Sequence, residues 1–299
     1  MGKKTRRGRN NTGFYFARAA RAGRADLAAR TPELASLNQK KVTMVGLGCL
    51  GAPSALEFAR CGIGEVRIID YDTVEAGTIV RWPFGLKAVG RHKTEVIRDF
   101  CREHYPFTRV VPYAHRIGQV RLTDKESSEF DILEAALSDT NLIYDASAER
   151  GVQYLLSDLA AELRIPYISV STTYGAWGGQ LVRVHPRRTQ GCWMCLMHSL
   201  DDGSIPSPAS DQRGEHQPAG CADPTFTGAS FDTAMIALGG VRLAVSTLAE
   251  EEAGGYPNFD WDVAVVNLRN EEGKVIPPSW RTFQISKHHS CGCAAKAEN

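Results

Sequence analysis

The first residues whose types and spacing could do chemistry are three glycines in the run GLGCLG at 46–51. A G-x-G-x-x-G pattern lets the backbone turn tightly and approach a phosphate, and the helix after it offers free N–H groups. Gly46, Gly48 and Gly51 lie between a β-rich run and a helical pattern, and Asp70 follows Gly51 by 19 residues. A carboxylate at that distance reaches a ribose hydroxyl. The spacing predicts a nucleotide site, whereas a merely tight turn does not account for the acid.

Charged residues after Asp70 indicate which nucleotide this site takes. Asp72 comes two residues later, and Arg81 and Lys93 follow it. Arginine presents a planar fork and lysine a point charge, and both suit phosphates whose charge rises during transfer. A basic pair placed after the ribose-binding acid favours a triphosphate over a dinucleotide. An NAD dehydrogenase is the alternative at the level of fold, and these charges argue against it.

Two close pairs of cysteines are the second chemical signal. Cys192 and Cys195 form a C-x-x-C pair, and Cys291 and Cys293 form a C-x-C pair. Four thiolates in two pairs match tetrahedral Zn²⁺, which would pin the tail of the chain to its middle. Four unrelated thiols or a redox pair are the alternatives. Three nearby histidines are candidates for substitute ligands: His198, His288 and His289.

The other four of the eight cysteines fall into two groups. Cys221 ends a Gly/Pro-rich segment just before a long helical stretch, where a helix dipole increases thiolate character. An ordinary loop cysteine is the alternative interpretation. Cys49, Cys61 and Cys101 lie within the strand–helix pattern and are expected to be small core residues.

β-rich and helical runs alternate over the first 170 residues. Strands are predicted at 41–48, 65–72, 109–117, 140–147 and 166–173, and helices at 54–62, 93–106 and 152–165. Strand–helix–strand order implies parallel strands joined by right-handed crossovers. The predicted fold class is therefore α/β, with an open, doubly wound, Rossmann-like sheet.

The pattern changes after Gly175. A strand at 178–186 and late strands at 262–270 and 282–288 predict a mixed or antiparallel half, and the longest helix is expected at 230–252. Residues 199–224 are rich in Gly, Ser, Pro and Asp and predict a crossover loop. Because no repeat or low-complexity linker interrupts the chain, residues 38–299 are expected to form a single domain.

Residues 1–37 form a basic arm. Before Glu33 they contain one acid, Asp26, among many arginines and lysines. The first eleven residues are expected to be disordered, and the Ala/Arg-rich segment after them is expected to be a solvated helix. The alternative for this arm is that it delivers an arginine to a phosphate.

The charge balance excludes one class of function. Of 299 residues, 35 are Lys or Arg and 34 are Asp or Glu, so the net charge is +1. That balance argues against nucleic-acid binding by bulk charge, and no sequence-specific nucleic-acid partner is expected. The basic start leads into no apolar run, and no stretch approaches the length of a membrane-spanning helix, so we expect a cytoplasmic protein without a membrane partner.

The run IIDYDTVEAGTIVRWPFGLKAVGRHKTEV resembles the nucleotide-site signature of the ThiF/MoeB and ubiquitin-activating-enzyme superfamily. The resemblance extends over about residues 38–293. It implies a ThiF-type fold in which Asp70 binds the ribose beside Asp72, while Arg81 and Lys93 hold the phosphates of ATP. An asparagine of the family pattern falls on Thr78, which alters one polar contact with phosphate.

The resemblance also implies two metal ions. In the family an aspartate three residues after a strand-ending aspartate holds the catalytic Mg²⁺. Here the strand ends at Asp145 and the later position is Ala148, so Asp145 and Glu149 are the remaining candidates. The family's structural Zn²⁺ site uses four cysteines at the places where this chain has its two pairs.

The implied activity is adenylation of the C-terminal glycine carboxylate of a ubiquitin-like, β-grasp protein, with Lys93 and Arg81 as catalytic cations. Cys221 would then form a thioester for transfer to a conjugating enzyme, or take part in sulfur transfer. The stretch CADPTFTGASFD resembles bacterial members found beside ubiquitin-like proteins, and antiviral conjugation is one pathway to expect. Gly178 and Gly179 are candidates to line the path of the incoming tail.

A homodimer is expected, because in relatives an arm arginine reaches the partner's site. The candidates here are Arg18, Arg21 and Arg24. Three other functions stay open: adenylation of a sulfur carrier for cofactor synthesis, a tRNA-modifying relative, and a non-catalytic nucleotide-binding scaffold. Thr78 and Ala148 are the residues that favour the scaffold.

Overall fold

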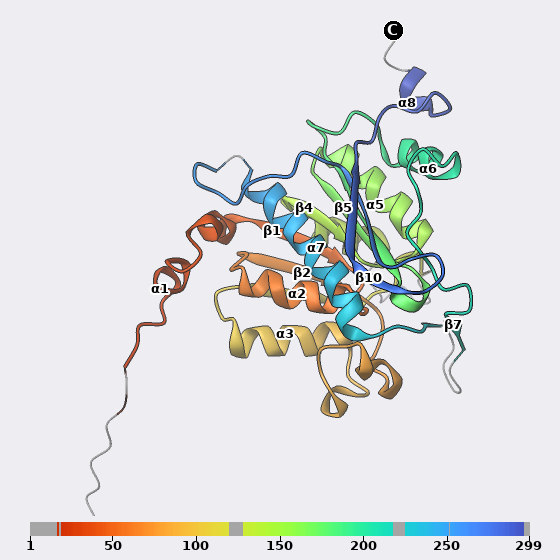
Figure 1. Ribbon diagram of the computed structural model, residues 1–299. Coiled ribbons are helices and arrows are strands. Elements are labelled where there is room, and N and C mark those ends of the chain that lie inside the picture. Colours follow the sequence, from red (N-terminus) through yellow and green to blue (C-terminus); the bar gives the residue numbers. More distant parts are fainter. Residues whose placement is uncertain (1–16, 18, 120–127, 218–224, 251, 296–299) are drawn as a thin grey trace, which may run out of the picture.

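An eight-stranded sheet forms the centre of the protein, as a computed structural model shows (Figure 1). The structure describes residues 17, 19–119, 128–217, 225–250 and 252–295. The strand order is β10-β9-β6-β5-β4-β1-β2-β3. The strands are β1 Lys41–Val45, β2 Glu65–Ile69, β3 Arg109–Tyr113, β4 Leu142–Asp145, β5 Tyr167–Thr172, β6 Gly178–Val184, β9 Val263–Arg269 and β10 Val275–Phe283.

The first five strands are parallel, which confirms the predicted doubly wound half. β1 pairs in parallel with β2 on one side and with β4 on the other, and β3 and β5 extend the sheet outward. Helices cover both faces, so most residues of β1, β2 and β4 are buried and apolar. The chain order reverses between β1 and β4, which makes their carboxyl ends a topological switch point.

The other half is antiparallel, as the sequence predicted. β6 pairs antiparallel with β5 and β9, and β10 pairs antiparallel with β9. The prediction of a last strand at 282–288 was wrong, because β10 spans Val275–Phe283. Two prolines, Pro277 and Pro278, made this segment look unlike a strand, but β10 is an edge strand whose register shifts between Val275 and Ser279. An edge strand tolerates residues without an N–H donor.

Two layers of helices sandwich the sheet. One face carries α2 Gly51–Arg60, α3 Lys93–His104 and α7 Ser230–Ala249, and the other carries α4 Glu129–Leu137, α5 Arg150–Leu163 and α6 Trp193–Asp201. The sequence predicted α2, α3, α5 and α7 but not α4 or α6. α4 begins with a capping box between Ser128 and Asp131, and α6 begins inside the C-x-x-C pair.

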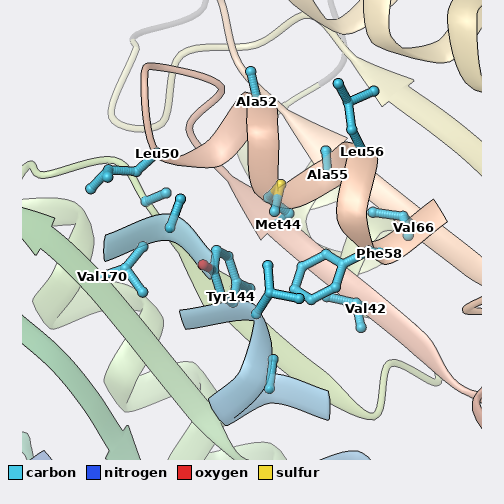
Figure 2. Close-up of a cluster of buried hydrophobic side chains, with 14 of the residues drawn as sticks. Val42, Met44, Leu50, Ala52, Ala55, Leu56, Phe58, Val66, Tyr144 and Val170 are labelled. Carbon is cyan, nitrogen blue, oxygen red and sulfur yellow. The ribbon is translucent and has the colours of Figure 1, made fainter. Parts of the chain in front are cut away.

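The core between α7, α2 and the sheet depends on the close approach of α7 to β4 (Figure 2). The phenol of Tyr144 on β4 lies among Val170, Phe58 and other apolar side chains, and its hydroxyl hydrogen-bonds Ser54 at 2.9 Å. A Cβ on Gly240 of α7 would lie 2.4 Å from that hydroxyl, so only glycine fits there.

α7 corrects one expectation about membrane segments. By length and composition α7 alone among the described helices could cross a membrane, and 67% of its apolar window is buried inside the protein. The burial fits a core helix, packed on β5 and β6.

The arm and the crossover segment complete the chain. α1 Arg24–Ala28 and the 3₁₀ helix η1 Pro32–Gln39 precede β1, and Leu37 of η1 is fully buried. α6 runs to Asp201, so the predicted crossover loop at 199–224 begins inside a helix and later includes the short strand β7 Glu215–His216. β7 pairs with β8 Thr225–Phe226. The predicted disordered start at 1–11 lies outside the described residues. Shorter helices are η2 Ala76–Val80, η3 Leu86–Ala88, η4 Tyr174–Ala176 and α8 Gly292–Ala295.

Candidate functional site

The glycine turn between β1 and α2 combines two tightly packed glycines with one that faces open space. Gly46 has a positive φ of 87°, and a Cβ there would lie 2.6 Å from the carbonyl oxygen of Ala146. A Cβ on Gly51 would lie 1.8 Å from the Gly46 carbonyl oxygen, so the turn itself requires both glycines. No described protein atom lies within 4 Å of a Cβ built on Gly48. The space in front of Gly48 is therefore open to a ligand.

Two cavities meet in front of this turn, at the switch point of the sheet. The first, of about 940 Å³, has an apolar wall and a polar floor, lined among others by Val45, Ile69, Ile117, Val152, Leu155, Gly46, Asp70 and Glu149. The second, of about 650 Å³, is lined among others by Cys49, Thr78, Arg81, Thr173, Tyr174, Thr225 and Phe226. Five residues line both: Gly48, Asp72, Lys93, Ala146 and Ser147. We call these the base cavity and the tail cavity.

Asp70 lies at the floor of the base cavity and fixes the glycine turn. Its carboxylate accepts hydrogen bonds from the backbone N–H of Leu47 at 2.6 Å and of Asp72 at 2.8 Å. Burial raises its pKa, against the opposing charge of Lys93 and these two N–H groups. A carboxylate has four lone-pair sites, so two remain for a further donor such as a ribose hydroxyl.

Lys93 is the cation that both cavities share. Its side chain is 9% exposed, and its ammonium lies 2.6 Å from the Asp72 carboxylate. Burial acts to lower the pKa of Lys93, but Asp70 and Asp72 outweigh it and hold that pKa above its ordinary value. Lys93 therefore keeps a positive charge at neutral pH, at the first residue of α3.

Arg81 also lines the tail cavity. Its guanidinium donates to the Thr225 hydroxyl at 2.8 Å and to the Phe226 carbonyl oxygen, and it lies 4.4 Å above the Phe226 ring. The next residue, Trp82, donates from its indole N–H to the carbonyl oxygen of Leu47 at 2.8 Å. Thr78 also lines the tail cavity, and its hydroxyl donates to the backbone carbonyl oxygen of Glu75.

Asp145 does not belong to either cavity, contrary to its predicted place at the nucleotide. Its carboxylate is fully buried and accepts hydrogen bonds from the Ser147 hydroxyl at 2.6 Å and the Tyr167 hydroxyl at 2.7 Å. Glu149 is exposed and lines the base cavity, whereas Ala148 lines the tail cavity with a positive φ of 57°. Glu149 is thus the acid of this loop that faces open space.

Gly178 and Gly179, expected along the path of the tail, line neither cavity. A Cβ on Gly178 would lie 2.5 Å from the Val266 carbonyl oxygen, and one on Gly179 would lie 2.6 Å from that of Ser171. Packing within the sheet accounts for both glycines.

The four predicted zinc ligands lie together, although the two pairs are about a hundred residues apart in sequence. The sulfur of Cys192 is 3.8 Å from that of Cys195 and 3.6 Å from those of Cys291 and Cys293. Tetrahedral Zn²⁺ with Zn–S bonds of about 2.3 Å separates its sulfurs by about 3.8 Å. All four sulfurs lie within 4.8 Å of one another, so the group fits one metal ion.

The environment favours the thiolate at one of these sulfurs, that of Cys195, whereas burial raises the pKa of Cys192 and of Cys293 above the ordinary value. Burial acts to raise the pKa of Cys195, but hydrogen bonds from backbone N–H groups and from its neighbouring thiols lower that pKa to about 7. One of these N–H groups belongs to His288, 3.3 Å from the sulfur. The imidazole of His288 instead bonds Asp202 at 3.1 Å, and it stacks between His198 and His289. Among the described residues these four cysteines are the only group of three or more His, Cys, Asp or Glu side chains that lie close enough to hold one metal ion.

The remaining sequence candidates are dispersed. Cys101 is buried, as expected for a core residue, but Cys49 and Cys61 are only partly buried, and Cys49 lines the tail cavity. Cys221 and Arg18 lie outside the described residues. Arg24 donates to the Phe107 carbonyl oxygen at 2.6 Å. Phe107 precedes β3 and so lies at the amino end of the parallel strands, whereas the cavities lie at their carboxyl ends. Arg21 is exposed.

Comparison with known proteins decides the family. The ThiF family model matches residues 23–293, which includes both cavities and all four cysteines. The protein belongs to the ThiF family. Its Rossmann-like sheet, parallel at first and antiparallel at the end, is the fold that this membership predicts.

Curated relatives of this ThiF protein include uncharacterized protein y4qC of Sinorhizobium fredii, 37% identical over 283 residues, 91% of this chain and 47% of y4qC. Adenylyltransferase and sulfurtransferase uba4 of Aspergillus clavatus is 28% identical, over 75% of this chain and 42% of its own length. The chain thus spans about half the length of the curated relatives it matches. The solved structure of E. coli MccB with ATP has the same fold, with a TM-score of 0.61 at 17% identity, covering 88% of this chain and 68% of MccB.

Two site residues were missed by the sequence reasoning. Tyr174, 47% exposed, lines the tail cavity from η4, and Phe226 lines it from β8. Both are aromatic residues outside any motif, and their position depends on how the crossover segment folds back over the sheet. No local signal marks them.

The four-cysteine geometry predicts the metal content. Cys293→Ser should reduce zinc from about one ion per chain to a small fraction, and should lower the melting temperature, because a structural ion contributes folding free energy. Elemental analysis of purified protein and a thermal melt measure both. Cys61→Ser, which alters a partly buried cysteine outside the cluster, should retain the ion. Wild-type protein without zinc would contradict the assignment.

Proposed function

We propose that this ThiF protein uses ATP to adenylate the C-terminal glycine carboxylate of a ubiquitin-like, β-grasp protein. One observation carries the proposal: the base cavity and the tail cavity meet at Gly48 and Lys93. The apolar wall of the base cavity suits adenine, and Asp70 suits the ribose. A peptide carboxylate in the tail cavity would then reach the α-phosphate from the other side of the same lysine.

The reaction places charge where the protein holds cations. One carboxylate oxygen forms a bond to the α-phosphorus, the bond from that phosphorus to the bridging oxygen breaks, and pyrophosphate leaves. Lys93, which lines both cavities, and Arg81, which lines the tail cavity, would stabilise the phosphate charge in the transition state. The open space before Gly48 lets the backbone approach the phosphates without a side chain between them.

Mg²⁺ would neutralise charge on the polyphosphate during this transfer. Glu149 is the acid placed to hold it, because its carboxylate is exposed at the base cavity, whereas Asp145 is occupied by Ser147 and Tyr167. Hard cations such as Mg²⁺ prefer oxygen ligands, which a glutamate supplies as well as an aspartate. Zn²⁺ would be held by the four cysteines and would have a structural role.

The proposal continues with a thioester on Cys221. This residue is four positions before Thr225, so their Cα atoms are separated by at most about 15 Å. Thr225 lines the tail cavity, where the acyl-adenylate would form. The thiolate would attack the acyl carbon and release AMP, and a conjugating enzyme would accept the ubiquitin-like protein afterwards.

Sulfur-carrier activation is the second candidate, and the similarity to uba4, named adenylyltransferase and sulfurtransferase, favours it. Both candidates share the adenylation step and differ in the acceptor of the activated carboxyl group. We further propose a cytoplasmic homodimer that shares arm arginines, with Arg18 and Arg21 as candidates because Arg24 donates to the Phe107 carbonyl oxygen.

Pyrophosphate exchange into ATP tests the adenylation step. With a ubiquitin-like protein encoded beside the gene, wild-type protein should exchange labelled pyrophosphate, and Lys93→Ala should reduce the rate by about 100-fold or more. Lys87→Ala removes an exposed lysine that lines neither cavity and should leave the rate unchanged. Absence of exchange with every such protein would exclude this enzymatic function.

A Cys221→Ala variant separates the two steps. It should abolish a reductant-sensitive conjugate with the ubiquitin-like protein, seen on a non-reducing gel, while pyrophosphate exchange persists, because the thiol acts only after adenylation. Cys61→Ala is the matched control and should keep both activities. If the conjugate still forms without Cys221, this residue has no part in the mechanism.

A further inference from the structure

Arg81, which we propose contacts the phosphates, is held by β8, a segment far away in the sequence. Arg81 makes three contacts with β8: the hydrogen bond to the Thr225 hydroxyl, the hydrogen bond to the Phe226 carbonyl oxygen, and the cation–π contact with the Phe226 ring. These partners are 144 and 145 residues from Arg81. A guanidinium has five N–H donors, and the two used here leave three for a ligand in the tail cavity.

The residue after Arg81 contacts the glycine turn. The Arg81 N–H donates to the Thr78 carbonyl oxygen at 3.0 Å, and the adjacent Trp82 indole bonds Leu47 of the turn. Two adjacent side chains, those of Arg81 and Trp82, therefore connect the hairpin β7–β8 with the turn that would face the phosphates. A further backbone bond joins the two strands of that hairpin, since the N–H of Thr227 donates to the Gly214 carbonyl oxygen at 2.7 Å.

We propose that Phe226 and Thr225 are positioning residues for Arg81, and that Arg81 thereby couples ATP binding to the docking of the β7–β8 hairpin. This inference rests on the proposed function only in taking ATP as the ligand. The ring of Phe226 covers one face of the guanidinium, which restricts its rotamers and leaves its edge toward the cavity. Phosphate contacts with the free edge of the Arg81 guanidinium would in turn favour the conformation in which Arg81 contacts Thr225 and Phe226 of the hairpin.

A double-mutant cycle on ATP affinity tests the proposal without any protein substrate. Titration calorimetry with MgATP should show that Phe226→Leu weakens binding roughly fivefold, the order expected for loss of one cation–π contact, while Phe226→Tyr keeps it. In an Arg81→Ala background, Phe226→Leu should add no further loss. His216→Ala, on the paired strand and outside both cavities, is the control and should bind as wild type does.

Two results would overturn the positioning role: an unchanged affinity for Phe226→Leu, or an equal loss with and without Arg81. Hydrogen–deuterium exchange supplies the second readout. MgATP should slow exchange in peptides that cover 213–217 and 225–230 in wild-type protein but not in Arg81→Ala, and equal slowing in both would refute the coupling. If wild-type protein does not bind MgATP, both the proposed function and this inference fail. The results named above would refute only the inference, so the two failures are distinguishable.

Discussion

The ion pair between Lys93 and Asp72 is the interaction on which the rest of the site depends. A lysine that is 9% exposed keeps its charge only if neighbouring carboxylates compensate for lost hydration, and here Asp70 and Asp72 do so. Asp70 in turn accepts the N–H of Leu47 and so holds the glycine turn. One compact group of charges therefore orders both the turn and the cation shared by the two cavities, before any ligand arrives.

The sheet places this group of charges beside the two cavities. The carboxyl ends of β1, β2 and β4 meet at the switch point, so the glycine turn, Asp70 and the loop at Ser147 converge without a long excursion of the chain. In the antiparallel half, the crossover segment returns to the same carboxyl ends of the parallel strands. There the Thr173 hydroxyl donates to the Ala209 carbonyl oxygen at 2.5 Å. The four cysteines, which line neither cavity, join α6 to the C-terminal segment.

Sequence reasoning succeeded where function is encoded at short range. The glycine spacing, the acid that ends β2 and the cysteine pairs are local patterns, and the structure brings the predicted zinc ligands together and places Asp70, Asp72, Arg81 and Lys93 at the two cavities. It failed where packing between segments that are distant in sequence determines the position of a residue. Tyr167 on β5 turns Asp145 inward, the edge position of β10 admits two prolines, and sheet contacts explain Gly178 and Gly179. None of these partners is visible from the neighbouring residues in sequence.

In the proposed reaction, the two cavities that share Lys93 form one site for attack on the α-phosphorus of ATP. The products reveal the position of attack, because that position decides which phosphates separate. Phosphorus NMR of a reaction containing the protein, MgATP and its ubiquitin-like substrate should show pyrophosphate appearing together with AMP, free or bound to the substrate's carboxyl group. ADP with inorganic phosphate would mean attack at the terminal phosphate and would contradict this function of the two cavities.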